Sequence, residues 1–141
     1  MDSPYFPCLS KRGSYYSTTG KCYRLSSTKT STWEKGSNEC KKDGGVLATI
    51  ENQATQDFIE KNIDWDAVDG HVWLGGVRKY EVWTWEDGTP WTGYTNWYID
   101  QPDDENVDNA VLAMHSRSQK SKKWYDLSEA DYQSLLSLCQ Y

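Results

Sequence analysis

Aliphatic side chains are scarce in this chain of 141 residues. Leu, Ile, Val and Phe together number only 22, and the net charge is −6, a combination that is common in disordered proteins. Eight Trp and ten Tyr offset this shortage, because a large ring buries as much apolar area as two aliphatic side chains. The composition therefore predicts a compact core built on aromatic residues, and the length fits a single domain over residues 1–141.

Long apolar runs, basic charge and histidine are also in short supply, and each shortage excludes a class of protein. The longest apolar run is Ala110–Met114, far below the roughly 20 residues that a membrane helix needs. The excess of acidic residues opposes nucleic-acid binding, which requires a net basic surface. His71 and His115 are the only histidines, so a histidine-rich zinc site is excluded. We expect neither a membrane protein nor a nucleic-acid binder.

Four cysteines are present, and none of them has the Cys-x-x-Cys spacing of a metal site. An even number of cysteines in a small chain with few aliphatic residues is typical of disulfides in an oxidising compartment. The sequence alone allows three pairings. Residues 1–30 contain no apolar stretch typical of a secretion signal, so we expect the mature form of a secreted, extracellular protein. Its two disulfides would involve Cys8, Cys22, Cys40 and Cys139.

The first half of the chain predicts two helices. Ser31 and Glu34 have the spacing of a capping box, and a helix over about 32–42 would follow, ended by Gly44-Gly45. A second helix is predicted over about 52–62, where apolar side chains recur on one face. Residues 1–30 suit short strands around a cysteine staple, and 46–50 suits another short strand.

The helical period is lost from Val72 onward, and aromatic strand segments replace it. We predict strands over 72–75, 82–85, 111–114, 124–127 and 135–139. Two helices packed against short antiparallel strands make the fold class α+β. Between Trp91 and Asn109 lies a long segment rich in Gly, Pro, Asn and Asp without a secondary-structure period. Ordered loops of this length usually carry function.

The acidic residues concentrate in this segment, because residues 100–109 contain five acids and no base. Carboxylate and amide oxygens at this density suit a hard cation such as calcium, which takes six to eight oxygen ligands. Pro102 favours this interpretation, since proline lowers the cost of a cis peptide that can turn the Gln101 and Asp103 side chains toward one point. The spacing is not that of an EF-hand. A solvated acidic turn is the alternative interpretation.

Several motifs, in order along the chain, resemble those of the C-type lectin-like domain. Residues 72–75, Val-Trp-Leu-Gly, resemble the core Trp-Ile-Gly-Leu segment of that family. Residues 83–88 followed by Asn96-Trp97 resemble its long loop region, and residues 123–126, Lys-Trp-Tyr-Asp, resemble its Trp-Asn-Asp strand. The resemblance covers nearly the whole chain.

The resemblance implies a C-type lectin-like fold of the long form. In that fold two helices pack on short antiparallel sheets, and a long loop binds the ligand. Cys40 and Cys139 fall where the family places its outer disulfide, and Cys8 with Cys22 resembles the disulfide of its N-terminal hairpin. The resemblance thus selects one of the three possible pairings.

The resemblance also implies a non-enzymatic lectin that binds a sugar through calcium. The implied calcium ligands are Gln101, Asp103, Asp108 and Asp126, and the implied sugar contacts are Gln101, Asp103, Asp108 and Tyr125. The order Gln-Pro-Asp implies terminal galactose or N-acetylgalactosamine on glycans, because exchanging amide and carboxylate inverts which sugar hydroxyl can donate. A single shallow site binds a sugar weakly, so a homo-oligomer would be needed for avidity.

Three departures from the family pattern leave alternatives open. Tyr125 stands where the family has a ligand Asn, and it would either stack on a galactose or pack within its strand. Ala110 stands at one position of the family's inner disulfide, whose partner cysteine is also absent. Residues 76–81 are shortened and carry two cations, so we expect one principal calcium ion. The alternative function is a calcium-independent module that binds protein or sugar directly. A glycosidase is disfavoured, because its acid must lie in an apolar pocket rather than on a hydrophilic loop.

Overall fold

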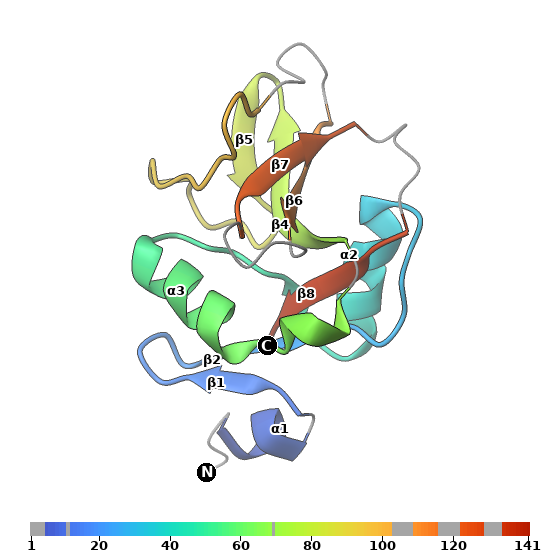
Figure 1. Ribbon diagram of the computed structural model, residues 1–141, viewed down its shortest axis with the longest axis vertical. Helices are drawn as coiled ribbons and strands as arrows, with labels where there is room; N and C mark the ends of the chain where they lie inside the picture. The colour runs from blue at the N-terminus through green and yellow to red at the C-terminus, as the bar shows by residue number, and fades with distance from the viewer. Residues whose placement is uncertain (1–4, 11, 69, 103–108, 116–121, 129–133) are drawn as a thin grey trace.

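The computed structural model describes residues 5–10, 12–68, 70–102, 109–115, 122–128 and 134–141. Within these ranges, helices α2 and α3 flank strand β8, and strands β4 to β7 form the opposite half of the molecule from β1 and β2 (Figure 1). The elements in chain order are α1 (Tyr5–Ser10), β1 (Ser14–Tyr16), β2 (Lys21–Leu25), α2 (Trp33–Lys42), β3 (Val46–Leu47), α3 (Gln53–Asn62), a 3-10 turn (Trp65–Ala67), β4 (His71–Lys79), β5 (Val82–Trp85), β6 (Val111–His115), β7 (Trp124–Leu127) and β8 (Leu136–Gln140).

The strands are joined in the order β1-β2-β8-β4-β6-β7, with β3 paired to β8 and β5 paired to β4. Strands β4 and β8 run parallel, and the other named pairs are antiparallel. The predicted α+β class, with two helices packed on short and mostly antiparallel strands, is confirmed. In the described ranges, no helix is long and apolar enough to cross a membrane.

Both predicted helices are present, and side chains cap their N-termini. Thr32 caps α2, since its hydroxyl oxygen accepts a hydrogen bond of 3.1 Å from the Lys35 backbone N–H. Asn52 caps α3 in the same way, with its side-chain oxygen 2.9 Å from the backbone nitrogen of Thr55. The capping box predicted for Ser31 was therefore wrong by one residue.

The strand predictions differ from the structure mainly at their ends. Strand β7 has the predicted bounds, whereas β4 continues to Lys79 because Tyr80 and Glu81 form a tight turn in which both residues have positive φ. Such a turn matches the twist of a two-residue hairpin. The predicted strand over 46–50 shortens to two residues. Helix α1 was not predicted, because it is short and carries no apolar period.

Apolar side chains fill both faces of the sheet, and the alternation along β4 shows this directly. Val72 and Leu74 belong to one cluster, together with Trp124, whereas Trp73 and Val77 belong to the cluster on the opposite face. Trp73 and Trp124 are among the largest fully buried side chains. The core is therefore aromatic, as the composition predicts.

Two disulfides tie the early part of the chain to the sheet. Cys8 of α1 bonds to Cys22 of β2, and Cys40 of α2 bonds to Cys139 of β8. This is the pairing that the family resemblance implies. No free cysteine remains in the described residues.

Candidate functional site

The loop that leads to Gln101 is anchored along the start of β7. The Trp124 backbone N–H donates to the Asn96 carbonyl at 2.8 Å, and the Tyr98 N–H donates to the Trp124 carbonyl at 3.0 Å. The Gln101 N–H then donates to the Tyr98 carbonyl at 3.0 Å, and the peptide between Gln101 and Pro102 is cis. Gln101 therefore lies one tight turn beyond Tyr98, which is bonded to Trp124 of β7. Strand β7 also carries Asp126.

Asp126 lies on β7 and is 3% exposed. It stands opposite Leu112 in the register of β6 and β7, on the face that also carries Trp124. A carboxylate at this depth is costly without a compensating charge or hydrogen bonds. Asp126 has such a partner in the structure, so this predicted calcium ligand is a buried, partnered carboxylate on β7.

Tyr125 projects to the opposite face of β7 from Asp126, because neighbouring residues of a strand alternate. Its ring stacks on the Tyr98 ring, with centroids 5.2 Å apart and 17° between the planes. The His71 and Tyr125 rings pack edge to face, with their centroids 5.0 Å apart. Partial burial raises the pKa of the Tyr125 phenol, and the neighbouring Tyr98 adds to this effect. The side chain is packed in an aromatic group rather than directed beside the Asp126 carboxylate.

The four predicted calcium ligands are thus only partly described. Gln101 and Asp126 are held by β7 and its neighbouring loop, whereas Asp103 and Asp108 lie outside the described residues. In the ranges that the structure covers, no three His, Cys, Asp or Glu side chains form a cluster suited to a metal. The donors that are present offer an amide and a carboxylate oxygen, which is the chemistry that calcium prefers.

A buried polar network that the sequence did not reveal fixes the start of β7. Gln56 of α3 is fully buried, and its side-chain oxygen accepts a hydrogen bond of 3.0 Å from Trp124 Nε1. Its amide nitrogen donates to the Lys122 carbonyl at 3.2 Å, and the Asn96 amide donates to the same carbonyl at 2.9 Å. Lys123 Nζ donates to Asn96 Oδ1 at 2.9 Å. The sequence contains one indication of this network: Gln56 lies one turn before Ile59, on the apolar face of the helix.

Packed tryptophan rings attach the loop that begins at Trp91 to Trp124 of β7. Trp91 stacks on Trp85 with centroids 4.3 Å apart, and Trp83 lies 5.3 Å from Trp97. Trp85, Trp91 and Trp97 all pack edge-on against Trp124. Aromatic packing and the Gln56 network therefore anchor a loop that lacks the inner disulfide of the family.

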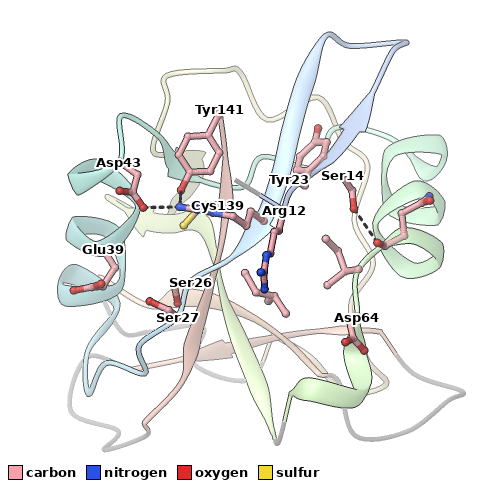
Figure 2. Close-up of a pocket in the computed structure, with 14 residues that line it drawn as sticks. Arg12, Ser14, Tyr23, Ser26, Ser27, Glu39, Asp43, Asp64, Cys139 and Tyr141 are labelled. Carbon is pink, nitrogen blue, oxygen red and sulfur yellow. Dashed lines mark hydrogen bonds and ion pairs between the residues drawn. The ribbon is translucent and has the colours of Figure 1, made fainter. Parts of the chain in front are cut away.

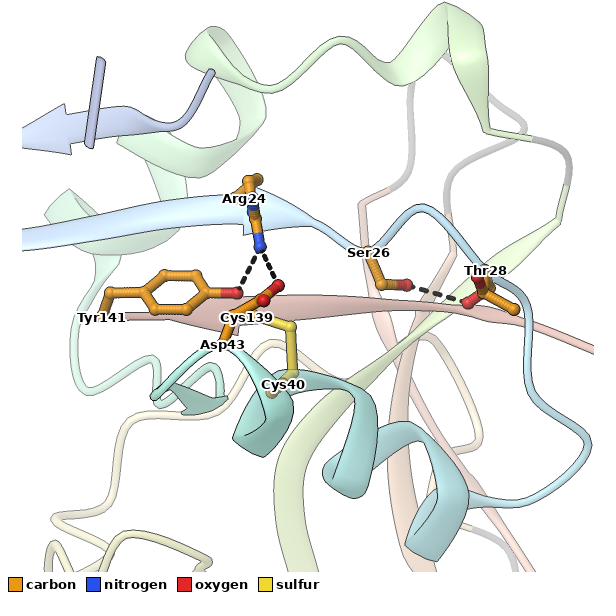
Figure 3. A network of polar contacts seen from close by, with 7 residues as sticks. All are labelled: Arg24, Ser26, Thr28, Cys40, Asp43, Cys139 and Tyr141. Atoms are coloured by element: carbon orange, nitrogen blue, oxygen red, sulfur yellow. Dashed lines mark hydrogen bonds and ion pairs between the residues drawn. A yellow bond between two sulfur atoms is a disulfide. The ribbon is translucent and has the colours of Figure 1, made fainter. Parts of the chain in front are cut away.

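A cavity of about 420 Å³ lies at β2, the end of α2 and the C-terminus, in the other half of the molecule from β7. Arg12 points into it, between Tyr141 on one side and Asp64 on the other (Figure 2). On its wall, the Arg24 guanidinium contacts the Asp43 carboxylate and donates to the Tyr141 hydroxyl at 2.9 Å (Figure 3). This network joins β2 and α2 to the C-terminus, so we assign it a structural role.

Comparison with known proteins shows the family. The model of the Lectin C-type domain matches residues 29–141. The type-2 ice-structuring protein of Hemitripterus americanus is 32% identical over 121 residues, which are 84% of this chain and 63% of that protein. The secretory phospholipase A2 receptor of Oryctolagus cuniculus is 34% identical over 79 residues, 54% of this chain but only 5% of the receptor. The chain thus spans less than two thirds of either relative.

Solved structures agree with this assignment. A calcium-independent type II antifreeze protein has a TM-score of 0.72 at 26% identity, covering 92% of this chain and 90% of that one. The C-type lectin CEL-I from Cucumaria echinata has a TM-score of 0.69 at 27% identity, covering 85% and 89% of the two chains. The chain belongs to the C-type lectin domain family.

Proposed function

We propose that the chain is a calcium-dependent lectin that binds terminal galactose or N-acetylgalactosamine on glycans. Its calcium ligands in this proposal are Gln101, Asp103, Asp108 and Asp126. The proposal is carried by the attachment of the Gln101 loop to Trp124 of β7, the strand that also holds the buried Asp126 two residues further on. The C-type lectin domain is a non-enzymatic binding fold, so we propose recognition without turnover.

The oxygen and amide groups of the four proposed ligands favour calcium as the ion and galactose as the sugar. A bound calcium ion would neutralise the crowded carboxylates and coordinate two vicinal sugar hydroxyls. The Gln101 amide would donate to one hydroxyl, and the Asp103 and Asp108 carboxylates would accept from the other. This order of amide and carboxylate supports galactose over mannose.

The stacked pair of Tyr98 and Tyr125 supports an aromatic wall for the sugar. Tyr125, the predicted sugar contact, projects from the face of β7 opposite to Asp126, so in this proposal it acts through Tyr98, on which it stacks and which is 40% exposed. The apolar face of galactose would pack against such a ring. Binding would be weak at one site, so we also propose that a homo-oligomer supplies avidity. The two disulfides support a secreted, extracellular location.

A second candidate is a calcium-independent module that binds protein, sugar or ice directly. Two observations favour it: the similarity to an ice-structuring protein and to a calcium-independent antifreeze protein, and Tyr125 in place of the family's ligand Asn. Thermal hysteresis that persists in the presence of a chelator would establish direct ice binding, and retention on galactose resin that persists in EGTA would establish direct sugar binding.

Retention on galactose resin tests the proposal. The wild-type chain should be retained in calcium and released by EGTA, and Asp126→Asn should not be retained. The matched variant Gln101→Glu/Asp103→Asn exchanges the amide and carboxylate and should move retention to mannose resin. Retention on galactose that persists in EGTA would contradict the calcium mechanism, and equal retention of the exchange variant would contradict the role of the two side chains.

A further inference from the structure

The only two histidines of the chain meet in the structure. His71 begins β4 and His115 ends β6, and the two are direct partners in the antiparallel register. Their ring centroids are 4.9 Å apart, with 86° between the planes. Both side chains are half-buried, so solvent reaches them. The Tyr125 ring borders both imidazoles, at 5.0 Å from His71 and 5.9 Å from His115.

We propose that His71 and His115 form a binding site for a transition-metal dication such as Zn²⁺ or Ni²⁺. Imidazole nitrogen is the ligand that these ions prefer, whereas calcium takes oxygen. Two imidazoles bound to one tetrahedral zinc at about 2.0–2.1 Å have ring centres about 5 Å apart. The observed separation of 4.9 Å therefore accommodates a shared ion after ring rotation.

Strand pairing holds the two histidine side chains side by side before any ligand binds. Residues opposite each other on antiparallel strands hold their Cβ atoms about 4.5–5.5 Å apart, so both side chains project from one rigid surface. The His115 backbone N–H donates to the Lys123 carbonyl at 2.9 Å, which fixes the end of β6 against the segment that enters β7. Little conformational entropy would be lost when the two imidazoles converge on an ion.

The site is separate from the proposed calcium site. The cross-strand register places His71, His115 and Tyr125 on the same face of the sheet, opposite to the face of Asp126. Across the described ranges, no third His, Cys, Asp or Glu joins the two histidines. In the proposed site these two imidazoles bind the ion and water completes its coordination, which gives the site an exchangeable ion and an open position.

Titration of ZnCl₂ into the untagged protein tests this inference. Calcium is kept in excess so that the proposed oxygen site is filled. We expect one zinc ion per chain, and His71→Ala and His115→Ala should each weaken its binding by about tenfold or more. Asp126→Asn should leave zinc binding unchanged, which separates this site from the proposed calcium site. Zinc affinity that is unchanged in both histidine variants would overturn the inference.

The imidazole resonances of the wild-type chain give a second readout that does not depend on the zinc affinity of a variant. Because the chain has only two histidines, their ring nitrogen signals are assigned by two substitutions. Zinc should shift both sets of signals at the same equivalence point. If zinc leaves both unchanged, or shifts only one, the shared site is excluded, whatever the galactose experiment shows.

Discussion

The Tyr125 ring lies stacked on the Tyr98 ring, 5.2 Å between centroids, and this contact joins β7 to the loop that carries Gln101. The Tyr98 N–H reinforces it by donating to the Trp124 carbonyl. The position where the family has a calcium-ligating Asn is thus used here to hold the loop through its ring. The phenol oxygen is not required for this role, and it projects from the opposite face to Asp126.

Removing the Tyr125 phenol oxygen should therefore leave the calcium affinity and the stability nearly unchanged. Removing the whole ring should lower the stability and the affinity for galactose. We expect Tyr125→Phe to keep the calcium affinity and the free energy of unfolding of the wild type. Tyr125→Ala should lose the ring pair, at a cost of about 1 kcal/mol in stability, and should weaken galactose binding. Calorimetry with calcium and urea denaturation measure the two effects. A large loss of calcium affinity in Tyr125→Phe would show that the phenol is a ligand.

Gln56 should be essential to the architecture of the loop. Gln56→Ala removes the acceptor of Trp124 Nε1 in a dry environment, so the free energy of unfolding should fall by about 1–3 kcal/mol. Ala54→Gln, at an exposed position of the same helix, is the control and should stay within about 0.5 kcal/mol of the wild type. Urea denaturation measures both variants. Equal stability of the two variants would mean that the network contributes nothing.

The two disulfides should differ in their contribution to stability. The loop closed by Cys40 and Cys139 spans 99 residues, and that closed by Cys8 and Cys22 spans 14. Chain entropy predicts a loss of about 4.7 kcal/mol for Cys40→Ser/Cys139→Ser and about 3 kcal/mol for Cys8→Ser/Cys22→Ser. Thermal unfolding of the two double variants tests the order, and a reversed order would refute this entropic account.

Tyr94 should make the chain sensitive to alkaline pH. Burial raises the pKa of its phenol to about 12, with further contributions from the negative charges of Asp57 and Glu60. Because the ordinary value is about 10, the unfolded chain releases this proton first, and stability is lost as the pH rises from about 10 to about 12. Tyr94→Phe keeps the ring beside Trp124 and should lose stability less steeply over that interval. The other tyrosines titrate in both proteins, so identical slopes would exclude the assignment to Tyr94.

Local patterns predicted most of the elements of the fold. Strand β7 has its predicted bounds because Trp124 and Asp126 are buried in alternation with half-buried neighbours. The N-cap of α2 is Thr32 rather than the predicted Ser31. Both are hydroxyl residues that can cap a helix, and they are adjacent, so the sequence does not distinguish them. Helix α1 escaped prediction because it has only six residues and is held by the Cys8–Cys22 disulfide rather than by an apolar period.

The site was less predictable than the fold. Gln101 and Asp126 remain predictions, which rest on the resemblance of short sequence motifs to those of the family. Gln56 and the facing histidines His71 and His115 were not predicted, because their contacts depend on how α3 and three strands are placed in space. Such contacts between distant segments follow from strand register, which a single sequence does not specify.

Calcium-dependent binding of galactose is the property on which the proposed function depends. An NMR titration of the untagged protein with galactose, repeated with mannose and each time with calcium or with EGTA, tests it most directly. We predict saturable shifts with galactose in calcium, weaker shifts with mannose, and none with either sugar in EGTA. Equal shifts with galactose in calcium and in EGTA, or a preference for mannose, would contradict the account.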